Sequence, residues 1–336
     1  MSALINLVKS RLNPPAEPTS VSFAGKTILL TGATSGLGFE AAIKFLNLGV
    51  STLIIGGRNI DRCNQAKAEL EKRTNRPGAV QAWLLDMNSF QSVVEFAERA
   101  RKELPRLDIA VLNAGLFHRA YNVSSDGWEE TLQVNALSTA LLALLLLPKL
   151  RESTSDSEPA HLTITSSYQF TRVKAESLRT DGRLLEHLND PKRFSGGKQY
   201  GISKLLLEYA IKNIARLTRN DDGTLQVIVN SVSPGFCGSS LGRQFNRFYE
   251  RWATWLLYKL FARTPEEGSR SLVSATYQGV ESHGKCWRSD GYLDESRTLT
   301  TGTEGEMLKE KAWKEIIEVL KPQAAEVEQI AGSISG

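Results

Sequence analysis

The stretch Lys26-Thr-Ile-Leu-Leu-Thr31-Gly-Ala-Thr-Ser-Gly-Leu-Gly38 decides the fold of this 336-residue chain. A short apolar run over residues 26–31 predicts a strand, and a helix is expected over residues 37–48. Between them, glycine allows the backbone to turn tightly and approach phosphate oxygens, while the N-terminus of the helix offers free N–H groups. The candidate dinucleotide-binding turn therefore consists of Gly32, Thr34, Ser35, Gly36, Leu37 and Gly38.

Apolar runs and helical patterns alternate along the rest of the chain. Further strands are expected over residues 52–56, 79–85, 109–112, 161–165 and 227–231. Further helices are expected over residues 60–73, 89–103, 128–150 and 200–217. Strands that alternate with helices form right-handed crossovers and a doubly wound parallel sheet. We therefore predict a single Rossmann-type α/β domain over residues 25–325, with an N-terminal arm over residues 1–24 and a C-terminal tail over residues 326–336.

The bulk composition gives no support for several kinds of partner and site. The chain is 41% hydrophobic and 23% charged, and its net charge of +4 gives no argument for a nucleic-acid or membrane partner. The longest apolar run, residues 140–148, is too short to span a bilayer, which needs about 20 residues, so a buried helix is expected. Cys63, Cys237 and Cys286 form no CxxC pair and have no histidine at metal-ligand spacing. We expect a reduced, cytoplasmic protein without a metal site or a signal peptide.

A second stretch, Tyr200-Gly-Ile-Ser-Lys204, places a tyrosine and a lysine one helical turn apart. This spacing puts both side chains on one face of a helix. A free tyrosine titrates near pH 10, so acid–base work near neutral pH requires a group that stabilises the phenolate. The ammonium group of Lys204 is such a group.

Together and in this order, the Gly-rich turn and the Tyr–Lys pair resemble the classical short-chain dehydrogenase/reductase family. The resemblance covers about residues 20–320 and implies hydride transfer between a nicotinamide and a carbonyl carbon, with Tyr200 as acid/base and Lys204 as its activator and a contact of the nicotinamide ribose. It also implies a serine that bonds the substrate oxygen and an asparagine that completes a proton relay. The strand pattern favours Ser167 over Ser166, and Asn135 matches the asparagine. A helix kink or a buried cap is the alternative role for Asn135.

The same resemblance implies further cofactor contacts. Asp86 ends the third strand, where family members bond the adenine amino group. The Asn113-Ala-Gly115 motif ends the fourth strand and supports the sheet next to the cofactor. After the sixth strand, the segment implied to contact the nicotinamide carboxamide contributes Pro234, Gly235 and Ser239.

The end of the second strand bears on the choice of cofactor, since it reads Ile55-Gly-Gly57-Arg58-Asn59. Sites that prefer NAD usually carry an acidic residue here, which holds the ribose hydroxyls. An arginine instead suits a 2′-phosphate, because its guanidinium forms charge-assisted hydrogen bonds. We therefore predict NADP (NADPH) rather than NAD. The alternative is that Arg58 only stacks on the adenine.

Two features point to a branch of the family. Ser167 and Tyr200 are 33 residues apart, and the charged stretch over residues 171–197 is expected to be irregular. This long spacing is similar to the retinol-dehydrogenase and WW-domain-oxidoreductase-like branch. Within it, the stretches His161-Leu-Thr-Ile, Pro234-Gly-Phe-Cys and Arg263-Thr-Pro-Glu-Glu-Gly268 are similar to filamentous-fungal members, many of which act in secondary-metabolite pathways.

Aromatic side chains are dense after Ser239. They predict a lid around residues 236–263 over a bulky apolar substrate, and the alternative is an amphipathic helix packed on the core or a partner. The side chains concerned are Phe245, Phe248, Tyr249, Trp252, Trp255, Leu256, Tyr258 and Phe261.

These features predict an NADP(H)-dependent oxidoreductase that interconverts a ketone or aldehyde and an alcohol on a medium-sized apolar molecule, in fungal secondary metabolism. One alternative is a catalytically silent NADP-binding regulatory or scaffold protein, against which the intact set of site residues argues. Another is epimerisation or dehydration on the same fold, which the TGxxxGxG spacing disfavours. The family associates through two long helices, and this sequence is compatible with a homodimer or a monomer.

Overall fold

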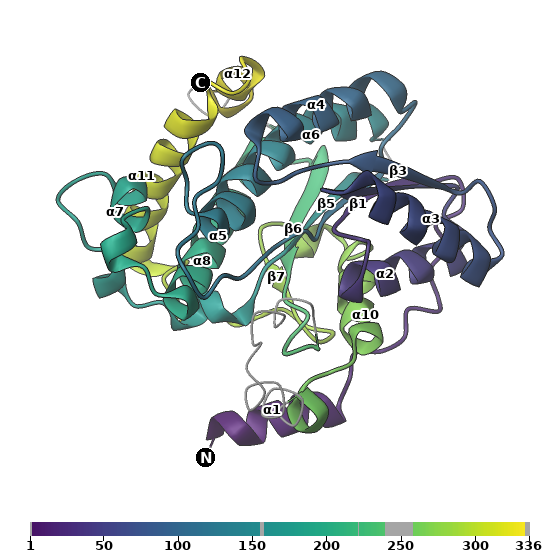
Figure 1. The fold of residues 1–336 in the computed structure, drawn as a ribbon, viewed down its shortest axis with the longest axis horizontal. Coiled ribbons are helices and arrows are strands. Elements are labelled where there is room, and N and C mark those ends of the chain that lie inside the picture. The colour runs from purple at the N-terminus through teal and green to yellow at the C-terminus, as the bar shows by residue number, and fades with distance from the viewer. Residues whose placement is uncertain (1, 155–157, 221, 239–257, 333–336) are drawn as a thin grey trace.

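The structure, a computed structural model, describes residues 2–154, 158–220, 222–238 and 258–332. Among these residues, seven strands form one parallel sheet in the order β3-β2-β1-β4-β5-β6-β7 (Figure 1). The strands are β1 (Thr27–Thr31), β2 (Thr52–Gly57), β3 (Val80–Leu84), β4 (Ile109–Leu112), β5 (Ala160–Thr165), β6 (Val227–Val232) and β7 (Cys286–Trp287).

The central strands are aliphatic runs that are buried on both faces. Every residue of β1, β4 and β6 is buried, which is typical of parallel strands covered by helices on both sides. The six predicted strands are confirmed, and their ends differ from the prediction by at most one residue. The two-residue strand β7, which pairs with the end of β6, was not predicted.

Helices cover both faces of the sheet (Figure 1). One layer contains α2 (Gly36–Asn47), α3 (Ile60–Thr74) and α10 (Pro265–Ala275). The other contains α4 (Phe90–Glu103), α6 (Ser138–Ser153) and α8 (Gly196–Leu217). The strand order reverses between β1 and β4, and a crevice forms at the carboxyl ends of strands where the order reverses. The predicted doubly wound Rossmann-type fold is confirmed.

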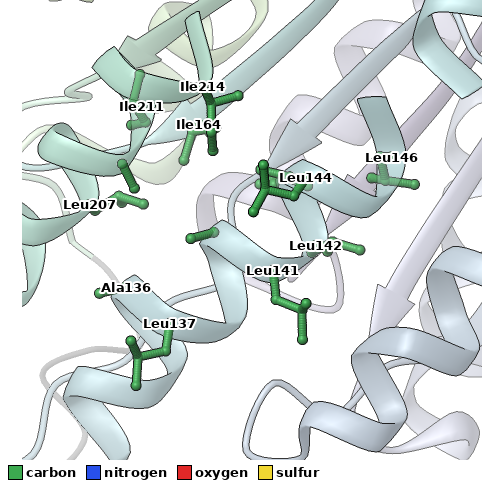
Figure 2. Close-up of a cluster of buried hydrophobic side chains, with 14 of the residues drawn as sticks. Ala136, Leu137, Leu141, Leu142, Leu144, Leu146, Ile164, Leu207, Ile211 and Ile214 are labelled. Carbon is green, nitrogen blue, oxygen red and sulfur yellow. The ribbon is translucent and has the colours of Figure 1, made fainter. Parts of the chain in front are cut away.

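The long helix predicted over residues 128–150 is not uniform. It consists of α5 (Glu130–Leu132), a π-helical turn (Gln133–Leu137) and α6. The stretch Glu130–Ser153 is long and apolar enough to cross a membrane, but 94% of its most apolar part is buried inside the protein. Figure 2 shows leucines of this helix in one buried hydrophobic cluster with Ile164 of β5 and Ile211 of α8. It is therefore a core helix, as its short apolar run predicted.

The stretch over residues 171–197 is more ordered than predicted. It contains α7 (Leu184–Leu188) and 3-10 turns at Tyr168–Arg172, Ala175–Ser177 and Pro191–Arg193. The backbone N–H groups of Leu184 and Leu185 donate to the buried carboxylate of Glu315, both at 2.8 Å. Glu315 belongs to α11 (Gly302–Leu320), so the C-terminal region holds this stretch in place.

The two ends of the chain also pack on the domain. The arm contains α1 (Ser2–Leu12) followed by an extended segment in which Pro15 and Pro18 are buried. It lies near the N-terminal end of α10 (Figure 1). At the other end, α12 (Glu326–Gly332) buries Val327 and Ile330 in the core. Residues 326–332, predicted as part of a tail, therefore belong to the folded body.

Candidate active site

The Gly-rich turn connects β1 to α2 and leaves the first N–H groups of that helix available. Gly36 has φ +61°, in the left-handed region that favours glycine. A Cβ atom on Gly38 would lie 2.4 Å from the carbonyl oxygen of Gly32, so the turn closes tightly on itself. Ser35 is the N-cap of α2 but makes no side-chain capping bond. The turn therefore has the geometry of a phosphate-binding helix N-terminus.

Asn113 holds the end of β4 against this turn. Its Nδ2 donates to the carbonyl of Thr31 at 3.0 Å, and its own N–H donates to Thr31 Oγ1 at 2.9 Å. Two residues later, a Cβ atom on Gly115 would lie 3.2 Å from Asn135 Oδ1 and 3.7 Å from Lys204 Nζ. The NAG motif thus links the cofactor turn to the candidate catalytic residues.

The residues predicted to bind the adenosine half lie at the carboxyl ends of β2 and β3. Asp86 is partly buried and accepts a hydrogen bond from Asn88 N at 3.0 Å. Arg58 is exposed and directly follows β2. A Cβ atom on Gly57 would lie 3.4 Å from Thr34 Cγ2, so this strand end is next to the Gly-rich turn. Their roles toward the cofactor stay predictions.

Tyr200 lies in the first turns of α8, where the hydroxyl of Ser167 reaches it from the end of β5. Burial raises the pKa of Tyr200, and hydrogen bonding to Ser167 opposes this rise. Ser166, by contrast, is 3% exposed and its hydroxyl faces Glu208 inside the protein. The ring of Phe117 meets the Tyr200 ring edge-on at 6.0 Å. Of the two serines, Ser167 is thus the one beside the phenol.

Lys204 follows one turn later on α8 and is almost fully buried. Its Nζ donates to the carbonyl of Thr165 at 2.8 Å. Burial lowers the pKa of Lys204 to about 8, and the carboxylate of Glu208 opposes this effect. The side chain is therefore held at the end of β5, and it loses its charge as the pH rises through about 8.

Asn135 lies in the π-helical turn, a feature that is frequent at functional sites. Its Oδ1 accepts from Leu116 N at 2.9 Å. Its Nδ2 donates to Leu116 O at 2.9 Å and to Ser203 Oγ at 3.1 Å. The buried amide is thus fully bonded and ties the segment after β4 to α8, so both a structural and a relay role are compatible with its position.

Glu208, which the sequence reasoning missed, lies one further turn along the same face of α8. It is 1% exposed, faces the hydroxyls of Ser166 and Ser231, and has no hydrogen-bond partner for Oε1 among the described residues. Burial raises the pKa of Glu208 to about 7; Glu295 adds to the rise, and Lys212 and the two serines oppose it. The signal was present in Leu205-Leu-Leu-Glu208, a lone acid in an apolar run four residues after Lys204.

The segment after β6 is described only in part. Gly235 has φ +87°, and the ring of Phe236 meets that of Tyr258 edge-on at 5.4 Å. Two backbone hydrogen bonds join residues 236–238 to Arg263, at 2.8 and 2.9 Å. Ser239 and most of the predicted lid side chains lie outside the described residues; these are the aromatic Phe245, Phe248, Tyr249, Trp252 and Trp255, and the aliphatic Leu256.

Sequence comparison agrees with this geometry. A family model described as short chain dehydrogenase matches residues 26–172. Short-chain dehydrogenase/reductase phmF of Phaeosphaeria nodorum is 45% identical and covers 96% of this chain and 94% of its own length. This chain belongs to the short-chain dehydrogenase/reductase family. Short-chain dehydrogenase/reductase ffsI of Aspergillus flavipes is 42% identical, with 96% of this chain and 94% of that protein covered. The predicted similarity to filamentous-fungal members is confirmed.

Solved structures share the fold. The RhlG/NADP active-site complex of Pseudomonas aeruginosa has a TM-score of 0.57 and 25% identity, over 80% of this chain and 96% of that one. A protein from Mycobacterium paratuberculosis has a TM-score of 0.62 and 21% identity, over 95% and 98% of the two chains, and shows the fold alone. As a short-chain dehydrogenase/reductase, this protein is an oxidoreductase of CH–OH and C=O groups with a nicotinamide cofactor and a small-molecule substrate.

Proposed function

We propose that this short-chain dehydrogenase/reductase uses NADP(H) to interconvert a ketone or aldehyde and an alcohol on a medium-sized apolar molecule, in fungal secondary metabolism. The observation that carries the proposal is the placement of Tyr200 and the buried Lys204 one helical turn apart on α8, with Lys204 held by the carbonyl of Thr165 and Ser167 at the end of β5 near the phenol. This arrangement offers a proton donor, a group that orients it and a cation that stabilises the resulting phenolate.

In the direction of reduction, the Ser167 hydroxyl donates to the substrate carbonyl oxygen and orients it beside Tyr200. When bound, the reduced nicotinamide supplies the hydride that the carbonyl carbon takes up. Tyr200 O–H donates its proton to the oxygen, which completes the alcohol and leaves a phenolate. Lys204, held by the carbonyl of Thr165, stabilises this phenolate through its ammonium charge. Asn135 bonds the backbone N–H and carbonyl of Leu116, and so it holds the segment after β4 in place beside these residues.

The choice of NADP is supported by the end of β2. Gly56 and Gly57 supply no acidic side chain there, and the exposed Arg58 makes no ion pair within the described residues. Such a guanidinium is available for a 2′-phosphate. The NADP in the Pseudomonas aeruginosa RhlG complex, which has a similar fold, points in the same direction.

The remaining parts of the proposal concern the substrate, the oligomeric state and the cellular compartment. Phe117 beside Tyr200, and the Phe236–Tyr258 pair, favour an apolar substrate. The helices α6 and α8 are covered within the same chain by α12 and α11, respectively, which favours a monomer (Figure 1). All three cysteines are free and buried, which is compatible with the reducing cytoplasm.

The test is NADPH oxidation by the purified protein with a panel of apolar ketones and aldehydes, compared with Tyr200→Phe. We expect this variant to lose at least about 100-fold in kcat while it keeps its affinity for NADPH. Tyr209→Phe is the matched control on the same helix, because its phenol only donates to the carbonyl of Leu299 at 2.9 Å. Turnover by Tyr200→Phe at the wild-type rate would remove the tyrosine from the acid role.

A further inference from the structure

The motif Arg263-Thr-Pro-Glu-Glu-Gly268 begins α10 and contains a buried guanidinium with an unusual set of partners. Arg263 is 2% exposed and makes no ion pair within the described residues. A buried cation of this kind is costly unless all its donors are bonded. Arg263 donates to the carbonyls of Ser10 at 2.9 Å, Asn13 at 3.0 Å and Pro234 at 3.2 Å, and to Ser289 Oγ at 2.9 Å.

Two of these carbonyls belong to the N-terminal arm, and neighbouring residues hold the same arm. Arg11 Nη1 donates to both carboxylate oxygens of Glu267, at 2.9 and 2.8 Å. Arg270 donates to the carbonyl of Pro15 at 3.1 Å and pairs with Glu17 at 2.9 Å. The first turns of α10 thus dock residues 10–17 through charged groups at several points.

The other side of the same motif contacts two elements of the candidate cofactor site, the loop after β6 and the helix α2. Arg263 Nη1 bonds the carbonyl of Pro234, and a Cβ atom on Gly235 would lie 3.2 Å from this nitrogen. A Cβ atom on Gly268 would lie 2.7 Å from Leu37 Cδ2, in the helix of the Gly-rich turn. The start of α10 is therefore pressed against the loop after β6 and against α2 at once.

We propose that Arg263 is a positioning residue through which residues 7–18 of the N-terminal arm set the Pro234–Gly235 loop for cofactor binding. The inference rests on the proposed function, because it takes this loop as a contact of the nicotinamide. The planar guanidinium spans arm and loop with a fixed geometry, which the single ammonium of a lysine does not reproduce. When the arm is undocked, Arg263 loses two of its four acceptors, and the loop loses the rigid partner that fixes its carbonyl.

The test compares three full-length variants by NADPH titration, thermal unfolding and hydrogen exchange of residues 234–238 without cofactor. Arg263→Lys removes the planar guanidinium with its several donors, and Arg11→Met removes the ion pair between the arm and Glu267. Arg76→Lys is the matched control, because Arg76 also bonds two backbone carbonyls, those of Leu46 at 3.1 Å and Val50 at 2.8 Å, away from the loop. We expect the NADPH Kd to rise about tenfold for Arg263→Lys and about threefold for Arg11→Met. For Arg76→Lys we expect a lower Tm and an unchanged Kd.

Faster exchange at residues 234–238 in both Arg263→Lys and Arg11→Met, but not in Arg76→Lys, would support the proposal. The proposal is overturned if these two variants lower only the Tm and leave both Kd and exchange unchanged. If Arg263→Lys does not fold, Arg11→Met decides alone, since it alters a side chain on the partly exposed arm. A wild-type protein that binds no NADPH would contradict the proposed function, whereas the exchange result still decides whether the arm holds the loop.

Discussion

Replacing Glu208 with glutamine should stabilise this protein in alkaline solution. Glu208 is 1% exposed, and burial raises its pKa from 4.5 to about 7. A rise of this size means that ionisation of Glu208 disfavours the folded state by about 3 kcal/mol. Because the folded-state pKa is the higher one, this cost is absent below pH 4.5, grows as the pH rises to about 7, and is complete above it. The glutamine variant escapes the cost, so its gain in unfolding free energy should appear only above about pH 5.

The same change should move the alkaline limit of activity to lower pH. Burial lowers the pKa of Lys204 to about 8, and the Glu208 carboxylate opposes this lowering. Two charges one helical turn apart in a protein interior interact by about 1–2 kcal/mol, or about one pH unit. Without the carboxylate, Lys204 loses its proton earlier, and the phenolate of Tyr200 loses its stabilising charge. We therefore expect the rate to fall about one pH unit sooner.

The assay is urea unfolding of wild type and Glu208→Gln at about pH 5 and about pH 8.5, together with kcat/KM as a function of pH. Glu315→Gln is the control, because this buried carboxylate accepts two backbone N–H bonds at 2.8 Å. Its neutralisation should destabilise the protein at both pH values. An equal stability change at both pH values for Glu208→Gln, or an unmoved alkaline limit, would refute the reasoning.

Two shorter predictions concern the same site, and a third concerns the assembly. Ser167→Ala should lower kcat about 100-fold, whereas Ser166→Ala should change it only slightly because this hydroxyl faces Glu208; equal losses would contradict the assignment. Lys204→Met should slow turnover at neutral pH, and alcohol oxidation by this variant should still rise with pH as the phenol of Tyr200 ionises; a wild-type pH profile would argue against the lysine as activator. Light scattering should give the mass of a 37.1 kDa monomer, and a stable dimer would show that α11 and α12 leave an association surface open.

Much of the fold was predictable because its strands are local signals. Runs such as Ile109–Leu112 are aliphatic, short and followed by Asn or Gly, so their position depends little on the rest of the chain. The strand β7 was missed because two residues make a strand only by pairing with β6. The π-helical turn was missed because Asn135 is held there by Leu116 and Ser203, which are remote in sequence.

The same distinction between local signals and long-range contacts holds for the site residues. Tyr200 and Lys204 were predictable because a helix of known period relates them. The partners of Glu208 and Arg263 were not, because burial and long-range contacts decide what a lone charge faces. Ser10, whose carbonyl bonds Arg263, lies 253 residues away in the sequence.

The most direct test of the central claim is a fluorescence titration of wild type and Arg58→Asp with NADPH and with NADH. We predict that wild type binds NADPH far more tightly than NADH. Arg58→Asp should weaken NADPH binding by about 1.5–3 kcal/mol while it affects NADH much less, because only NADPH carries the 2′-phosphate. Equal affinity of wild type for both cofactors, or an equal effect of the substitution on both, would contradict the account.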